Sequence, residues 1–214
     1  MTAALTAETT SEFFEQNFHT PVMAILRGYT PDRTVELCRR AWSVGITMVE
    51  VPVMTRDHLP ALQAAVATGR EQGRTVGAGT ILTPEQVDDV AAAGAVFTVA
   101  PGYDPRVADA AGRRGLAHLP GVATASEITA AVLAGHRWLK AFPAASLGTS
   151  WFTAQHGPFP QVSFVATGGI SSANAAAFLN AGARVVAVGS ALEDPSQLDA
   201  LAELLIPIHE EAPR

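Results

Sequence analysis

The residue with the clearest chemical potential in this sequence is Lys140, which lies inside the apolar run WLKAFP at positions 138–143. Such a run is typical of a short buried strand, and lysine is rarely fully buried. One interpretation is a lysine at a strand tip whose ammonium reaches water. The other is a lysine at the bottom of a cleft, where desolvation lowers its pKa and leaves the amine a nucleophile near neutral pH.

A carboxylate, Glu50, lies in a second apolar run, MVEVP at positions 48–52. Strand alternation gives Glu50 the same facing as Met48 and Pro52, which in a barrel is the interior. An interior carboxylate is costly unless it is paired, and Lys140 would be its natural partner. The pair is either a structural ion pair or a functional one, in which Glu50 moves protons while Lys140 forms a covalent bond.

Two glycine turns are the third feature of the sequence that could carry chemistry. Thr167, Gly168 and Gly169 follow one apolar run, and Gly189 and Ser190 follow the next. They are either tight turns that need glycine or a phosphate site built from backbone N–H groups and a helix N-terminus. Together with the lysine, they indicate a carbonyl substrate with a phosphate at one end and an amine nucleophile at the other.

The elements that position these residues form a regular rhythm. Eight short apolar runs occur at residues 22–26, 48–53, 75–81, 96–100, 116–119, 138–142, 162–166 and 185–188. The segments between them have helical periodicity, with capping threonines at Thr30, Thr83 and Thr124. Gly45, Gly94, Gly135 and Gly182 stand where helices should end.

This rhythm predicts an α/β fold, a (β/α)8 TIM barrel whose site lies at the carboxyl ends of the strands. The alternative, an open doubly wound sheet, lacks a glycine-rich dinucleotide turn after the first run. We expect one barrel domain over residues 1–214, with a loose tail at 1–8. A short N-terminal helix at 10–18 would be capped by Thr10 or Ser11 and would present Phe13, Phe14 and Phe18 to a larger core.

Composition excludes several classes of protein. Hydrophobic residues make up 48% of the 214 residues and the formal net charge is -6, which argues against nucleic-acid and membrane-surface partners. No apolar run is long enough to span a bilayer, and the N-terminus lacks the pattern of a secretory signal. The single cysteine, Cys38, fits a buried helix position in a reducing compartment. We expect a cytoplasmic protein.

The histidines give no sign of a metal site. Six histidines are present, but their spacing matches no set of metal ligands and no cysteine or aspartate joins them. His118, within an apolar run, is expected to be a hydrogen-bonded core or interface residue. We therefore predict neither a metal nor another cofactor.

In these residues and their order, the chain resembles the KDPG/KHG aldolase family, class I aldolases acting on 2-keto-3-deoxy-6-phosphogluconate and 4-hydroxy-2-oxoglutarate. The resemblance covers nearly all of residues 21–192. Its carriers are AILRG at 24–28, EVP at 50–52, GAGT at 77–80, PG at 101–102 and 120–121, LKAFPA at 139–144, GPFP at 157–160 and TGGI at 167–170. The lysine and glutamate motifs in this order are highly specific, whereas the glycine turns occur in other phosphate-binding barrels.

The resemblance implies a retro-aldol cleavage that yields pyruvate and glyceraldehyde 3-phosphate. Lys140 would form a Schiff base with the C2 carbonyl, and Glu50 would shuttle protons through a water molecule. The pyruvyl carboxylate would lie against Thr80 and an arginine, with Pro101 and Phe142 as apolar walls. Phosphate would bind Gly168, Gly169, Gly189 and Ser190. The family is typically trimeric, so a homotrimer is expected by analogy.

One departure from the family pattern concerns the carboxylate site. Many members read EVTLRT after the second strand, with that arginine on the carboxylate; here the run is EVPVMT, so Met54 takes its place. Arg27 is then the expected partner, and Arg56 is out of register. The proline-containing pattern is closer to the phosphogalactonate branch, whereas Thr167 is typical of the gluconate branch and would read the C4 hydroxyl. We expect KDPG as the substrate.

Two rival functions predict different outcomes. Another phosphate-binding barrel, such as a thiamine-phosphate synthase or a phosphosugar epimerase, would have no essential lysine on the sixth strand. A non-catalytic sensor of sugar-acid phosphates would bind without forming an imine.

Overall fold

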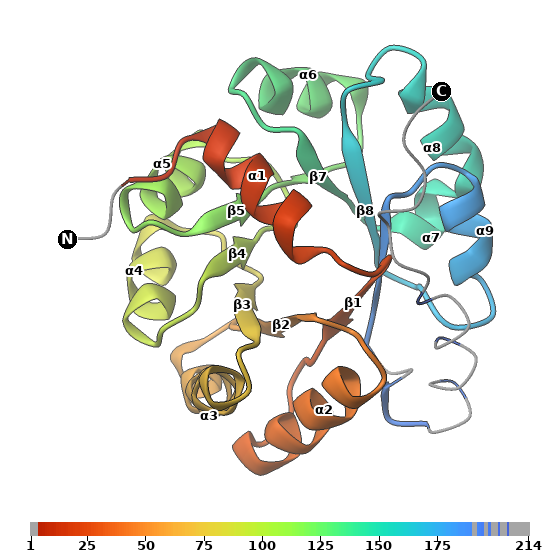
Figure 1. Ribbon diagram of the computed structural model, residues 1–214. Helices are drawn as coiled ribbons and strands as arrows, with labels where there is room; N and C mark the ends of the chain where they lie inside the picture. Colours follow the sequence, from red (N-terminus) through yellow and green to blue (C-terminus); the bar gives the residue numbers. More distant parts are fainter. Residues whose placement is uncertain (1–3, 190–191, 195–196, 198–200, 202–204, 206–214) are drawn as a thin grey trace.

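The computed structural model describes residues 4–189, 192–194, 197, 201 and 205. Parallel strands form a ring, and helices surround it on the outside (Figure 1). The strands are β1 (Val22–Ile25), β2 (Met48–Pro52), β3 (Thr75–Gly79), β4 (Phe97–Val99), β5 (Ala117–Leu119), β6 (Gly121–Val122), β7 (Trp138–Ala141), β8 (Ser163–Thr167) and β9 (Val185–Val188). Each predicted apolar run overlaps a strand, so the expected rhythm is confirmed.

The helices of the described residues alternate with these strands. They are α1 (Ala7–Asn17), α2 (Pro31–Ser43), η1 (Arg56–His58), α3 (Leu59–Glu71), α4 (Pro84–Ala92), α5 (Pro105–Arg113), α6 (Ala125–Leu133), α7 (Ala144–Leu147), α8 (Thr149–His156) and α9 (Ala175–Asn180). The four glycines expected to end helices, Gly45, Gly94, Gly135 and Gly182, all have φ between 90° and 106°. In this left-handed region glycine escapes the steric cost that a side chain would carry.

The nine segments form a nearly closed barrel of eight strands, because β5 and β6 are the two halves of the fifth strand. The order of pairing is β5-β4-β3-β2-β1-β9-β8-β7-β6, parallel throughout. Pro120, which has no N–H, separates the halves. Leu119 O accepts from Ala100 N on one side, and Pro120 O accepts from Lys140 N at 2.8 Å on the other. The predicted barrel is confirmed; the break in its fifth strand is a feature that the sequence reading missed.

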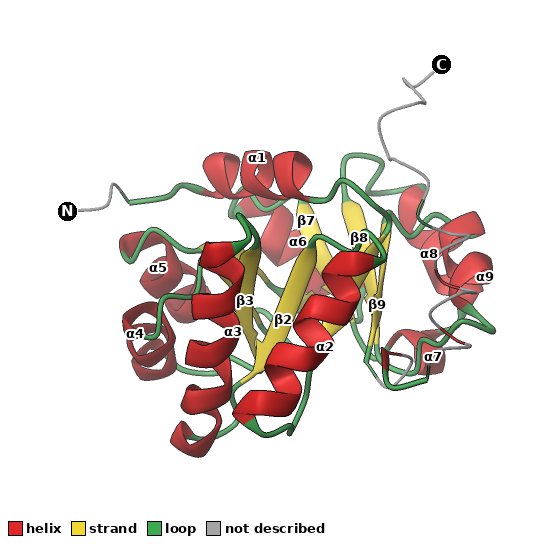
Figure 2. Cartoon of the chain, turned by 60° about the horizontal axis from the view of Figure 1, so that its bottom comes forward, coloured by secondary structure: helices red, strands yellow, loops and turns green. Residues whose placement is uncertain are grey.

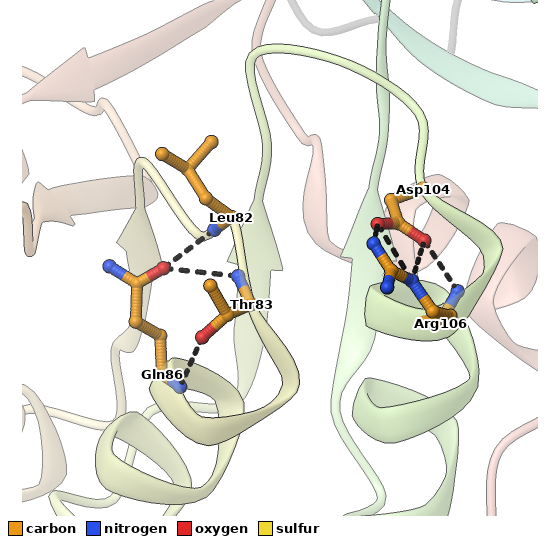
Figure 3. Close-up of polar contacts among 5 residues, drawn as sticks. All are labelled: Leu82, Thr83, Gln86, Asp104 and Arg106. Atoms are coloured by element: carbon orange, nitrogen blue, oxygen red, sulfur yellow. Dashed lines mark hydrogen bonds and ion pairs between the residues drawn. The ribbon is translucent and has the colours of Figure 1, made fainter.

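The predicted capping threonines start the helices that follow β3 and β6. Thr83 accepts a hydrogen bond from Gln86 N, while Gln86 Oε1 accepts from the backbone N–H groups of Leu82 and Thr83 at 2.7 and 3.1 Å (Figure 3). Thr124 forms the same box with Glu127. At the start of α5, Asp104 caps the Arg106 N–H and pairs with its guanidinium (Figure 3). These caps satisfy backbone donors that would otherwise lack partners. They also fix the residue at which each loop that leaves the carboxyl end of a strand ends and its helix begins.

Helix α1 covers the amino-terminal end of the barrel (Figures 1 and 2). It begins at Ala7 with Thr6 as its cap, so the expected start at residue 10, the caps at Thr10 or Ser11 and the eight-residue tail were wrong. Thr10 is instead a buried residue inside the helix. The Thr6–Thr9 capping box accounts for the earlier start, since threonine at both positions satisfies the first-turn amides.

Aromatic side chains fill the amino-terminal half of the barrel interior. Phe14 and Phe18 pack against Trp138 with ring centroids 6.1 and 5.0 Å apart, and Phe14 also meets Phe97 at 6.1 Å. A second apolar layer lies between the sheet and the outer helices. Because aromatic rings occupy the amino-terminal half, the open space of the barrel lies at the carboxyl ends of the strands.

Candidate active site

Lys140 and Glu50 both lie inside the barrel, on opposite walls. Lys140 is on β7 and Glu50 on β2, and three strands lie between them in the ring: β8, β9 and β1. Glu50 is 0% exposed and Lys140 only 3% exposed. The alternative of a lysine at a strand tip reaching water is therefore wrong. The inward facing expected for Glu50 is confirmed by Gly79, over which its carboxyl lies.

Burial moves both groups toward their neutral forms. It raises the pKa of the Glu50 carboxyl, although the charges of Lys140 and Arg27 pull that pKa down. It lowers the pKa of the Lys140 amine, with Glu50 opposing the shift and Arg27 adding to it. Neither Glu50 oxygen has a hydrogen-bond partner among the described residues, and none of their ion pairs joins Glu50 to Lys140. The arrangement supplies an amine nucleophile and a carboxylic acid facing one lumen.

A cleft of about 350 Å³ opens at the carboxyl ends of the strands. The Lys140 ammonium nitrogen lies 4.9 Å from the centre of the Phe142 ring, which is part of the cleft wall. Six of the predicted site residues line the cleft: Arg27, Phe142, Thr167, Gly168, Gly169 and Gly189. The structure therefore brings the two glycine turns, Arg27 and the ring beside the lysine to one opening.

The glycine turn after β8 is tightly constrained. Gly168 and Gly169 have φ of 95° and 75°. A methyl group on Gly169 would lie 2.5 Å from Ala145 Cβ, and one on Gly168 would lie 3.0 Å from the Phe142 ring. Asn174 holds the turn by accepting from Ser171 N and donating to Gly169 O, both at 2.9 Å. Helix α9 begins only at Ala175, so the turn, not a helix N-terminus as expected, faces the cleft.

Three predicted site residues remain to be described: Thr80, Pro101 and Ser190. Thr80 and Pro101 follow β3 and β4 and do not line the cleft. A methyl group on Gly121, the register partner of Lys140, would lie 2.2 Å from the Pro101 carbonyl carbon, which puts Pro101 beside the lysine strand. Ser190 lies outside the described residues.

Arg56, Met54 and Arg27 are the three side chains that bear on the predicted carboxylate site, and they differ in exposure and in partners. Arg56 donates two hydrogen bonds to Asp89, at 2.8 and 3.1 Å, and its side chain is 79% exposed. Met54 is 39% exposed. Arg27 lines the cleft and shifts the pKa values of both Glu50 and Lys140. Of these three side chains, Arg27 is the one that acts on the buried pair.

Sequence reasoning missed several features of the site. Tyr29 lines the cleft and donates a short hydrogen bond to Glu193; burial, with help from Glu193, raises the pKa of its phenol to about 12. Thr80 has φ of 63°, a left-handed conformation that is rare for a β-branched residue. Tyr29 could have been found from its place two residues after Arg27, but nothing in the sequence signals the backbone of Thr80.

Two other side chains singled out in the sequence are structural. His118 is 1% exposed, shares a hydrogen bond of 2.9 Å with Thr98 and has a pKa lowered by burial to about 3, as expected for a core histidine. Cys38 is buried in α2, and burial raises the pKa of its thiol to about 12. No three His, Cys, Asp or Glu side chains of the described residues are grouped so that they could hold a metal ion. In that same part of the chain, every helix is too short or too polar to cross a bilayer.

Comparison with known proteins identifies the family. The family model for KDPG and KHG aldolases matches residues 15–204, which is most of the chain. The chain belongs to this aldolase family. It is thus a lyase, and the rival assignment to another family of phosphate-binding barrels was wrong.

Individual relatives of this aldolase come from two branches. It is 36% identical over 176 residues to a probable 2-dehydro-3-deoxy-6-phosphogalactonate aldolase of Rhizobium meliloti (strain 1021), covering 82% of each chain. It is 40% identical over 165 residues to a 2-dehydro-3-deoxy-phosphogluconate aldolase of Treponema pallidum (strain Nichols), covering 76% of this chain and 77% of the relative.

A solved structure of a KDPG aldolase from Legionella pneumophila, with pyruvate captured as a covalent carbinolamine intermediate, superposes with a TM-score of 0.75. It shares 31% identity with this aldolase and covers 87% of this chain and 92% of its own. A carbinolamine is the first covalent product of an amine and a carbonyl, so that relative uses class I chemistry.

Proposed function

We propose that this aldolase cleaves 2-keto-3-deoxy-6-phosphogluconate into pyruvate and glyceraldehyde 3-phosphate through an imine on Lys140. The observation that carries the proposal is the buried Lys140 amine, with its lowered pKa, in the same lumen as the unbonded carboxyl of Glu50. The captured carbinolamine of the Legionella pneumophila relative supports the same chemistry.

The reaction begins when the neutral Lys140 amine attacks the C2 carbonyl and forms a carbinolamine. Glu50, whose pKa is raised by burial, supplies from its protonated form, through water, the proton that lets the C2 hydroxyl leave, giving an iminium ion and a carboxylate. That carboxylate then takes the C4 hydroxyl proton. The C3–C4 bond breaks, its electron pair moves to the iminium nitrogen, and the aldehyde product is released. Protonation of the resulting enamine at C3 and hydrolysis of the imine give pyruvate and the free amine.

The substrate carboxylate is assigned to Arg27 and Thr80. Arg27 lines the cleft and its charge reaches both catalytic groups, while Arg56 is occupied by Asp89. Phe142, whose ring lies 4.9 Å from the Lys140 nitrogen, is assigned as one apolar wall around the pyruvyl carbons. Pro101, which lies beside the lysine strand although it is not part of the cleft lining, is assigned as the other. Apolar walls help to keep the amine neutral, because they withhold the water that would solvate an ammonium.

The phosphate is assigned to the two glycine turns, with Gly168, Gly169, Gly189 and Ser190 as its ligands. Successive backbone N–H groups in left-handed turns form concave anion sites. With a net charge of -6, the protein as a whole does not attract a phosphorylated acid, so these local donors and Arg27 must hold it.

A second candidate substrate is the C4 epimer, 2-keto-3-deoxy-6-phosphogalactonate. The relative from Rhizobium meliloti favours it, as does the motif in which Pro52 and Met54 depart from the common pattern. Thr167 favours the gluconate epimer: it is 3% exposed and lines the cleft, and we assign its hydroxyl to the C4 oxygen of the substrate. 4-Hydroxy-2-oxoglutarate, which carries no phosphate, is a third candidate substrate.

The cellular setting is proposed from the family resemblance. We place this aldolase in the cytoplasm as a homotrimer acting on a small molecule, without a nucleic-acid or membrane partner. Sedimentation at several protein concentrations tests the trimer directly: a single species of three chains is expected, and a monomer would contradict it.

Pyruvate release from the three substrates tests the proposed function. The wild-type protein is expected to release pyruvate fastest from the gluconate epimer, and Lys140→Met is expected to release none. Faster release from the galactonate epimer would reassign the substrate but keep the mechanism. Release by Lys140→Met at the wild-type rate would refute the proposal.

A further inference from the structure

The inner face of β3 carries almost no side chains beside Glu50. Positions two apart share one face of a strand, and on this strand the inward positions above Thr75 are Gly77 and Gly79. In the register of β2 and β3, Glu50 is paired with Gly77 and Pro52 with Gly79. Glycine in a buried strand is unfavourable, because it contributes no packing and loses much conformational freedom on folding. Two such glycines on one face therefore need a reason.

The space above each glycine is occupied by a neighbouring side chain. A methyl group on Gly77 would lie 2.3 Å from the Phe97 ring, which leans across from β4. A methyl group on Gly79 would lie 1.7 Å from Glu50 Oε1, 2.4 Å from its Cδ and 2.8 Å from its Cγ. The carboxyl of Glu50 thus rests directly on the backbone of β3 at Gly79.

The backbone of Gly79 does not itself require glycine. Its φ is outside the left-handed region, unlike that of Gly168 or Gly169. Its carbonyl accepts an ordinary ladder hydrogen bond from Val53 N at 2.8 Å. An alanine at this position would fit the strand, so the close approach of Glu50 is what excludes a side chain.

No hydrogen bond from the residues that the structure describes fixes the Glu50 carboxyl. Both of its oxygens are buried and lack a partner among the described residues. Its position is therefore determined by the shape of the space around it, and the floor of that space is Gly79. A carboxyl that must exchange protons with a water and a substrate benefits from oxygens that are not already bonded to the protein.

We propose that Gly79 is a positioning residue of this aldolase: its missing side chain sets where the Glu50 carboxyl lies and so controls the proton transfers. This rests on the proposed function, in which Glu50 carries those protons. Ordinary contact with a Cβ begins at 3.4 Å, so Gly79→Ala would push Oε1 away from β3 by on the order of 1 Å or more. A misplacement of about 1 Å can cost on the order of a hundredfold in rate.

The test is a double-mutant cycle on turnover. Gly79→Ala is expected to lower kcat about a hundredfold in the wild-type background, with KM changed by less than about threefold. In the Glu50→Gln background, where no proton can be carried, Gly79→Ala is expected to lower kcat no further. An equal loss in both backgrounds would mean a general structural defect and would overturn the proposal, as would unchanged kcat in the wild-type background.

The matched control is Gly157→Ala, at the end of α8. Gly157 has φ of -56°, and a methyl group there would meet only Ala154 O at 3.7 Å. It is expected to keep wild-type kcat. If Gly79→Ala does not fold, the pair Glu50→Asp and Glu50→Asp/Gly79→Ala replaces it, because the shorter side chain retracts from β3. Near-equal kcat of these two supports the proposal, and a large further loss overturns it.

Failure of this proposal is distinguishable from failure of the proposed function. If Glu50→Gln keeps wild-type kcat, the role of Glu50 itself is wrong. If Glu50→Gln loses activity and Gly79→Ala does not, only the positioning role of Gly79 is wrong.

Discussion

Replacing Lys140 with methionine is expected to make the protein more stable while abolishing its activity. Methionine has a similar unbranched length, so the change keeps most of the packing and removes the buried amine. Lys140 is 3% exposed and burial lowers the pKa of its amine. The unfolded chain binds a proton at this amine up to a pH of about 10.4, whereas the folded chain releases it at a lower pH.

The difference in free energy of unfolding between wild type and Lys140→Met depends on pH, and the sign of this dependence follows from the lowered pKa of Lys140. Between the lowered folded pKa and about 10.4, the unfolded state holds one more proton than the folded state. The free energy of unfolding of the lysine protein therefore rises with pH, by about 1.4 kcal/mol per pH unit. This contribution is complete above pH 10.4 and is lost as the pH falls to the folded pKa. Methionine does not titrate, so the advantage of Lys140→Met should shrink as the pH rises.

Urea unfolding at pH 7, 8, 9 and 10 measures this difference. The comparison is best made between Glu50→Gln and Glu50→Gln/Lys140→Met, because a titrating Glu50 would otherwise shift with its partner. Protein concentration is held constant, since subunit association would add to apparent stability. All other groups titrate equally in both proteins and cancel. A difference that stays constant over the four pH values would show that the pKa of Lys140 is not lowered, and would refute the account of its reactivity.

Three further predictions concern the site and the fold. Glu50→Gln is expected to lower kcat on the order of a hundredfold or more and to slow imine formation with pyruvate, because both steps use the Glu50 proton; wild-type turnover would remove Glu50 from the mechanism. Arg27→Met is expected to raise KM about tenfold or more through loss of a charge-assisted contact, whereas Arg56→Met, which breaks only an exposed pair with Asp89, should leave KM unchanged; equal effects would contradict the assignment. Phe14→Ala is expected to lower the free energy of unfolding by about 3–5 kcal/mol, because it empties the base of the barrel; urea unfolding that showed no loss would contradict the packing role of α1.

The fold was predictable because its signals are local. Short apolar runs, capping threonines and stop glycines each depend on a few neighbouring residues, and their repetition specifies a barrel. Helix α1 was placed too late because three aromatic positions dominated the interpretation, while the capping pair Thr6 and Thr9 was overlooked. The fifth apolar run was expected to end at Leu119, but the strand continues beyond Pro120, since the carbonyl of a proline still accepts a ladder hydrogen bond.

The chemistry of the candidate site was predictable only where a residue type is unusual for its surroundings. Lys140 and Glu50 stood out because charged residues seldom occur in apolar strands. Gly79 did not, because the sequence does not show that the side chain of Glu50 leans over the neighbouring strand. The contact between Tyr29 and Glu193 joins positions 164 residues apart and likewise leaves no local signal. Thr80, with its unusual φ, lies between Gly79 and Ile81, whose backbones bond to different neighbouring segments, at Val53 and Val99, and these long-range contacts also leave no local signal.

Borohydride trapping tests the central claim most directly. The wild-type protein is incubated with pyruvate, reduced, and digested for mass spectrometry. We expect one stable adduct, on the peptide that contains Lys140, and none in Lys140→Met. An unmodified wild-type protein, or an adduct on any other lysine or on the amino terminus, would contradict the account.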